Sequence, residues 1–178
     1  MKKASDCIFV GGIHGVGKSS LCAAFSVKTK VAHYVASDLI KSLRNEDANL
    51  HKEVNNLTQN QDALLTAISL MINEPQYLLD GHFVIRVAGK GLSPVPTEIF
   101  RAIQPLGIII VTGNALHASD RIKSRDFKDI PPVLLEQMQI AEIAHGNHVA
   151  KELDIPLHIL DDPSEVQFHD TVLSFFRL

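Results

Sequence analysis

The sequence predicts a three-layer α/β/α fold built around a five-stranded parallel sheet. Short, almost uninterrupted apolar segments alternate along the chain with longer segments that have the apolar spacing of helices. Strands without an alternation of apolar and polar residues are typical of parallel sheets whose two faces are both covered by helices. Ligands of such sheets bind beyond the carboxyl ends of the strands. We therefore expect the functional side chains to follow the strands directly.

Each element is predicted from its own pattern. Five short apolar segments bounded by turn residues are predicted as strands, namely Cys7–Gly11, Val31–Ala36, Gln76–Asp80, Leu106–Thr112 and Pro156–Leu160. Helices are predicted over Lys18–Lys28, Ser37–Arg44, Gln59–Ile72, Thr97–Ile103, Asn114 to about Ser124, Pro132–Leu153, and from Asp162-Pro163-Ser164-Glu165 to about Phe176.

The helix ends and the remaining segments carry further signals. Ser37 or Asp38 and Asn114 are predicted as N-caps, and Asp162-Pro163-Ser164-Glu165 resembles a capping box with proline at the first helical position. Three glycine and proline turn signals predict a loop over Val87–Pro96, and Gly146 is expected to weaken the long helix.

Composition narrows the class of protein. The chain has 178 residues, 46% of them apolar and 21% charged, which is ordinary for one globular domain and excludes wholesale disorder. No stretch reaches the roughly 18 apolar residues of a membrane span. A net charge of -3 disfavours a nucleic-acid partner. With only two cysteines, a disulfide framework is excluded, so we expect reduced thiols and a cytoplasmic protein.

A glycine-rich motif follows the first predicted strand and opens the first predicted helix. Residues 12–19 match the phosphate-binding loop pattern G-x-x-x-x-G-K-[ST] in full. Glycines let the backbone amides surround a polyphosphate, and the helix N-terminus adds a partial positive charge. Lys18 is expected to reach the β- and γ-phosphates, and Ser19 to bind Mg²⁺. The predicted ATP-binding residues are Gly12, Ile13, His14, Gly15, Val16, Gly17, Lys18, Ser19 and Ser20.

A missing motif and the chain length distinguish among the classes of P-loop NTPase. The chain has no Asn-Lys-x-Asp motif of the kind with which small GTPases read their base, and it is too short for a large ring ATPase. A P-loop kinase acting on a small molecule suits its length.

Asp80 ends the third predicted strand and precedes a glycine, which is the place for a carboxylate that holds Mg²⁺ or its water. The segment Asp80-Gly81-His82-Phe83-Val84-Ile85-Arg86, together with the P-loop and Arg121-Ile122-Lys123-Ser124-Arg125-Asp126, resembles the adenylate kinase family, and most closely its archaeal type. The resemblance covers most of the chain. It implies ATP and Mg²⁺ as cofactors and a nucleoside monophosphate as the phosphoryl acceptor.

The resemblance and the residue chemistry assign roles near the acceptor. His82 would orient a water or an acceptor hydroxyl, although a structural histidine fits the sequence equally well. Arg86 would clamp the acceptor phosphate, because its planar fork suits phosphate oxygens. Asp38 and Lys41 follow the second strand, where the family recognises its acceptor. The family commonly has an arginine where this chain has Lys41, which leaves the acceptor open.

Arg121 and Arg125 lie four residues apart and share one helix face. Such arginines stabilise the charge that develops on a transferred phosphoryl group. We therefore predict Lys18, Asp80, His82, Arg121 and Arg125 as catalytic residues, with Ser19 and Asp80 as metal ligands.

The predicted organisation is a single domain over residues 1–178, with an acceptor-binding insertion at about 37–73 and a short lid at about 121–131. Phosphoryl transfer to a nucleoside monophosphate is the favoured function. Two alternatives remain open. One is a P-loop kinase for a nucleoside, a small metabolite or a nucleic-acid 5′-end. The other is a nucleotide-gated ATPase that acts with a protein partner, which the shortened lid would suit because water is less well excluded.

Overall fold

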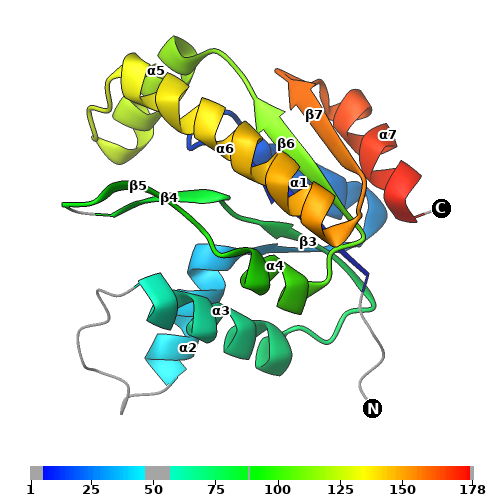
Figure 1. Ribbon diagram of the computed structural model, residues 1–178. Coiled ribbons are helices and arrows are strands. Elements are labelled where there is room, and N and C mark those ends of the chain that lie inside the picture. The colour runs from blue at the N-terminus through cyan, green and yellow to red at the C-terminus, as the bar shows by residue number, and fades with distance from the viewer. Residues whose placement is uncertain (1–5, 47–56, 88, 177–178) are drawn as a thin grey trace.

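Five parallel strands form the central layer of the molecule (Figure 1). The computed structural model describes residues 6–46, 57–87 and 89–176. The sheet has the order β2-β3-β1-β6-β7, and all neighbouring strands run parallel. Its strands are β1 (Asp6–Gly11), β2 (Ala32–Val35), β3 (Gln76–Asp80), β6 (Gly107–Thr112) and β7 (Leu157–Asp161). The predicted five-stranded parallel sheet is confirmed.

Helices cover both faces of this sheet, as Figure 1 shows. Along β1, Cys7 and Phe9 face one apolar core, while Ile8 and Val10 face another. The first core is shared with α2 (Ala36–Glu46), α3 (Leu57–Met71), α4 (Thr97–Ile103) and the C-terminal part of α6 (Pro132–Leu153). The second is shared with α1 (Lys18–Thr29), α5 (Ala115–Asp126), α7 (Glu165–Phe176) and the N-terminal part of α6.

The topology brings three chain segments together at the carboxyl ends of the central strands. β1 pairs with β3 on one side and with β6 on the other. Because these strands are parallel, the loop after β1, the residues after β3 and those after β6 lie beside one another. This end of the sheet is the place at which doubly wound sheets bind ligands.

The predicted N-cap of α5 is confirmed, whereas the start of α7 needs a correction. The Asn114 side chain accepts hydrogen bonds from the backbone N–H groups of Leu116 and His117, at 2.9 and 3.1 Å. At α7 the Ser164 hydroxyl accepts from Gln167 N at 3.2 Å, so Ser164 is the cap. Pro163 therefore precedes the helix and does not occupy its first position.

The predicted loop over Val87–Pro96 is wrong for much of its length. Val84–Val87 forms β4 and Gly91–Pro94 forms β5, and the two strands pair antiparallel as a hairpin beside the main sheet. Gly89 and Gly91 have φ angles of 75° and 78°, so the glycines serve the turn of this hairpin. Pro94 is tolerated because both strands of a two-stranded ribbon are edges.

Gly146 does not weaken α6, which is continuous from Pro132 to Leu153. A Cβ atom at Gly146 would lie 2.4 Å from Ile110 Cδ1 and 3.4 Å from the Phe83 ring. The glycine therefore lets the helix approach the sheet closely, and the gain in packing outweighs the helix propensity it gives up.

The helices α2 and α3 correspond to the predicted insertion, and they pack on each other through Leu39, Leu43, Leu64 and Ala67. The link between them, residues 47–56, lies outside the described residues. Cys7 and Cys22 are both buried and free of disulfides. None of the helices described here has the length and apolar character that crossing a bilayer requires.

Replacing Phe168 tests the packing of α7 on the sheet. Phe168 is fully buried, so Phe168→Ala is expected to lower the free energy of unfolding by about 3–5 kcal/mol in chemical denaturation. Val166→Ala is the matched control, because Val166 is 67% exposed on the same helix and its truncation should cost less than about 0.5 kcal/mol. Equal losses in the two variants would contradict this arrangement.

Candidate active site

The loop after β1 has the conformation that a polyphosphate requires. Gly12, Gly15 and Gly17 have φ angles of 138°, 83° and 95°, which favour glycine strongly. A Cβ atom at Gly12 would also lie 2.3 Å from the Val111 carbonyl oxygen, so no larger residue fits. Helix α1 begins at Lys18 directly after this loop, and its N-terminus is directed into it. The loop therefore suits the phosphate tail of ATP.

The carboxyl ends of β1 and β3 bring together Lys18, Ser19 and Asp80. Lys18 Nζ lies 3.4 Å from Asp80 Oδ1, and the Ser19 hydroxyl donates a hydrogen bond to Asp80 Oδ2. Lys18 is 6% exposed and Asp80 is 1% exposed. A carboxylate and a hydroxyl oxygen next to a phosphate cradle are the ligands that Mg²⁺ prefers, so these residues fit the predicted metal.

His33, the second residue of β2, also lies close to Asp80. Its Nε2 is buried without a hydrogen-bond partner among the described residues and lies 3.7 Å from Asp80 Oδ2. Burial raises the pKa of Asp80, but His33, Lys18 and Ser19 together lower it by more. The pKa of Asp80 therefore lies below its usual value, and the carboxylate is ionised at neutral pH.

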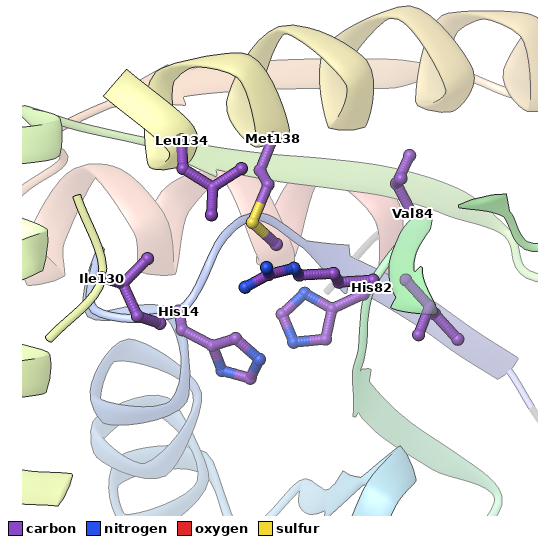
Figure 2. A pocket seen from close by; sticks show the side chains of 8 residues that line it. His14, His82, Val84, Ile130, Leu134 and Met138 are labelled. Carbon is purple, nitrogen blue, oxygen red and sulfur yellow. The ribbon is translucent and has the colours of Figure 1, made fainter. Parts of the chain in front are cut away.

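His14 of the P-loop lies against His82 of the segment that follows β3. Their ring centroids are 4.3 Å apart, and Figure 2 shows the two rings close together below Leu134 and Met138 of α6. Loss of water around the ring and the nearby His82, Lys18 and Arg125 lower the pKa of His14 from 6.5 to about 4. His14 is therefore neutral at pH 7.

These histidines separate two cavities. The smaller, of about 210 Å³, lies between β4, the start of α6 and the segment before it, and Arg86 lines it with His14, His82 and Met138 (Figure 2). The larger has a volume of about 590 Å³ and is lined by Lys18, Ser19 and Asp80 at its phosphate end. Its remaining wall is mostly apolar and comes from Phe9, Val35, Ile40, Leu64, Ile99 and Phe100.

The larger cavity also has a polar end on α3. Gln61 is 6% exposed, and its Nε2 has no hydrogen-bond partner among the described residues. Asn60 stands next to it and accepts a hydrogen bond from Arg44 of α2. The wall of the larger cavity thus contains a polar amide among mostly apolar side chains.

The three residues predicted for the acceptor do not meet at one point. Asp38 lines the larger cavity, and Arg86 lines the smaller one. Lys41 lines neither cavity and pairs with Asp38 at 3.1 Å on an exposed face of α2. Lys41 is therefore connected to the larger cavity only through its ion pair with Asp38.

The two predicted arginines of α5 contact different partners. Arg121 Nη1 donates to the Gly15 carbonyl of the P-loop at 3.0 Å. Arg125 forms a bidentate pair with Asp126, at 2.7 and 2.8 Å, and its side chain also lines the larger cavity. Arg121 thus contacts the P-loop directly, and Arg125 lines the larger cavity while it is paired with Asp126.

Sequence reasoning missed four residues that shape the site: His33, Gln61, Gln139 and Glu142. Glu142 is 1% exposed, and Gln139 binds both the N–H and the carbonyl of Gly113 through its amide, at 3.1 and 3.2 Å. A signal for Glu142 was present, because it occupies a buried position in the stripe that Leu135, Met138, Gly146 and Val149 form on α6. An acidic residue in such a stripe requires a specific partner.

A family model described as AAA domain matches residues 11–130, which is more than half of the chain. The matched region contains the P-loop, Asp80, His82 and the arginines of α5. No curated protein sequence matches the chain.

Solved structures share the fold along nearly the whole chain. A gluconokinase from Sinorhizobium meliloti 1021 is 13% identical, with a TM-score of 0.55, over 98% of this chain and 93% of its own. A sugar kinase from Janibacter sp. HTCC2649 is 14% identical, with a TM-score of 0.56, over 97% of this chain and 95% of its own. An uncharacterized protein from Eubacterium ventriosum ATCC 27560 is 11% identical, with a TM-score of 0.53, over 97% of this chain and 98% of its own.

These likenesses confirm the predicted three-layer fold of a P-loop NTPase. They do not single out the adenylate kinase family, which the sequence resembles. At such identities they concern the fold and leave the acceptor open.

The pKa of His14 predicts a pH dependence of stability. The unfolded chain binds a proton at this residue below about pH 6.5, whereas the folded chain does so only below about pH 4. Protonation between these values therefore favours unfolding, and the stability that neutral His14 contributes is lost as the pH falls from about 6.5 to 4.

We expect the melting temperature of the wild type, relative to that of His14→Asn, to fall by about 2–4 °C across this range. That shift corresponds to about 1 kcal/mol of unfolding free energy in a chain of this size. The value is smaller than the change in pKa alone would give, because more than a third of the His14 surface is exposed and solvent screens its charge. A difference between the two proteins that does not change with pH would contradict the lowered pKa.

Proposed function

The chain belongs to the AAA domain family, and from that premise we propose that it is an ATP- and Mg²⁺-dependent phosphotransferase whose acceptor is a nucleoside monophosphate. The observation that carries the proposal is the contact of buried Lys18 and Asp80 with the exposed Ser19, which stands between the P-loop and a cavity of about 590 Å³. One wall of this cavity is thus ready for the phosphates of a donor, and the rest is free for an acceptor.

The residues of the donor side have separable roles. The amides of the P-loop and the Lys18 ammonium bind the β- and γ-phosphates of ATP, and Ser19 and Asp80 hold the metal. Mg²⁺, when bound, neutralises phosphate charge and orients the terminal phosphoryl group. Arg121 steadies the P-loop from α5, and Arg125, once released from Asp126, adds positive charge where negative charge develops.

The acceptor side is built from the predicted insertion and the segment after β3. An apolar cavity that ends in the free amide of Gln61 suits a flat heterocycle that carries hydrogen-bond acceptors at its edge. Arg86 lines the neighbouring smaller cavity together with His82, and there it would bind the acceptor phosphate. We propose that α2 and α3 form the acceptor-binding insertion and that residues 121–131 form a short lid.

A second candidate acceptor is a small metabolite with a hydroxyl group. Two solved structures that share this fold are described as a gluconokinase and a sugar kinase. His82 lines the larger cavity, where it could accept a hydrogen bond from such a hydroxyl. The mostly apolar wall and Gln61 favour the nucleotide over a polyol.

We also predict a cytoplasmic location, because the cysteines are reduced.

Loss of the Lys18 ammonium tests the donor side. In a thermal-shift titration with Mg²⁺ and a non-hydrolysable ATP analogue, the wild type should be stabilised, because a ligand that binds only the folded state raises its stability. Lys18→Ala should weaken binding at least about tenfold. Lys28→Ala is the matched control, since Lys28 lies on the exposed end of the same helix and contacts Glu165. Unchanged binding in Lys18→Ala would refute the proposed ATP site.

An acceptor screen tests the rest of the proposal. ADP formation from Mg²⁺-ATP is measured with AMP, GMP, CMP and UMP, and in parallel with gluconate and simple sugars. We expect at least one nucleoside monophosphate to accelerate it strongly. Faster turnover with gluconate or a sugar than with every nucleotide would contradict the nucleotide acceptor, and hydrolysis that no acceptor accelerates would favour the ATPase alternative.

Gln61 supplies a sharper test of the acceptor cavity. Gln61→Leu keeps the volume of the side chain but removes its donor, so the KM of the acceptor should rise about tenfold while the KM of ATP stays constant. Gln137→Leu, on the exposed face of α6, is the control. If the KM of ATP and of the acceptor rose together, Gln61 would have no specific role.

A further inference from the structure

Helix α6 holds the segment that follows β3 through one buried carboxylate. Glu142 Oε1 accepts hydrogen bonds from Phe83 N at 3.0 Å and from Val84 N at 3.1 Å, and Oε2 also accepts from Phe83 N at 3.0 Å. The side chain is 1% exposed. No lysine or arginine nitrogen of the described residues lies within 4.0 Å of this carboxylate, so backbone N–H groups supply most of its stabilisation.

The same carboxylate faces the histidine of the site. His82 Nδ1 lies 3.5 Å from Glu142 Oε1 and is buried, with no hydrogen-bond partner among the described residues. The His82 side chain is 23% exposed in all, so part of the ring remains open to the cavities that it lines. Among the described residues, Glu142 is therefore the acidic group within 4.0 Å of the buried nitrogen, and the ring also lines both cavities.

The nearby carboxylate favours one of the two tautomers of the His82 ring. A carboxylate can only accept hydrogen bonds, so the His82 tautomer with a proton on Nδ1 is favoured beside it. Nε2 then keeps its lone pair and can accept a hydrogen bond from a hydroxyl or water in the larger cavity. The opposite tautomer would place a lone pair against the carboxylate.

We propose that Glu142 is a positioning residue of the active site: it anchors the backbone that follows Asp80 and holds His82 with Nδ1–H toward itself and Nε2 toward the acceptor. The inference rests on the proposed function for its purpose, but the state of His82 is measurable without any substrate. Helix α6 would therefore support the Asp80-Gly81-His82 segment, although α6 itself carries none of the sequence motifs.

The test uses nitrogen NMR of the ¹⁵N-labelled full chain at about pH 8, where imidazole rings are ordinarily neutral. His82→Asn identifies the resonances of His82. In the wild type we expect a single tautomer with the proton on Nδ1. In Glu142→Gln, whose amide can donate to Nδ1, we expect the proton to move to Nε2 or the two tautomers to mix. Glu136→Gln is the matched control, because Glu136 is exposed on the same helix.

A kinetic readout accompanies the spectra. With Mg²⁺-ATP alone, Glu142→Gln should lower kcat of ATP hydrolysis by about 10- to 100-fold, because His82 would lose its orientation; losses of this size follow when groups that orient metal-bound histidines are removed. The KM of ATP should stay within about twofold, because Glu142 touches no P-loop side chain.

Two results would overturn the inference. The first is a wild-type His82 with its proton on Nε2, and this result needs no variant, so it decides even if Glu142→Gln fails to fold. The second is an unchanged tautomer in a folded Glu142→Gln. A normal Nδ1–H tautomer in a protein that does not bind ATP would instead contradict the proposed function and leave the role of Glu142 on His82 intact.

Discussion

The contact between the Lys18 ammonium and the Asp80 carboxylate, 3.4 Å apart and almost fully buried, is the interaction on which the rest of the site depends. An isolated buried charge is costly, and Lys18 is one of the groups that lower the pKa of the buried Asp80 carboxyl. The contact joins the turn after β1 to the end of β3, two neighbouring strands of the sheet. The glycine-rich loop proposed to hold phosphates and the carboxylate proposed to hold Mg²⁺ are thereby kept together.

Helix α6 is the second element that supports the chain at the carboxyl ends of these strands. Gln139 binds both backbone polar groups of Gly113 after β6, and three residues later Glu142 binds the backbone after β3. Residues three apart share a helix face, so one rigid element fixes the chain after two strands. Gly146 permits this by letting α6 approach Ile110. The site is thus held by packing and hydrogen bonds on elements whose own sequences carry no recognised motif.

The fold and the donor side of the site could be predicted from the sequence because their signals are local. The P-loop occupies eight consecutive residues, and the alternation of strands and helices is visible along the chain. The hairpin over Val84–Pro94 was missed because glycine and proline mark turns without showing that the flanking residues pair. Glu142 and Gln61 act across long sequence separations, so only the folded chain shows what they face. The identity of the acceptor could not be predicted for the same reason, because the cavity proposed to bind it is assembled from residues of β1, α2, α3 and α4.

The most direct measurement of the central claim is calorimetric titration of ATP into the wild type and into Asp80→Asn, each with and without Mg²⁺. If Asp80 and Ser19 hold the metal beside the P-loop, Mg²⁺ will strengthen ATP binding to the wild type and will have little effect on binding to Asp80→Asn. Equal Mg²⁺ dependence in the two proteins, or no binding of ATP to the wild type, would contradict the account.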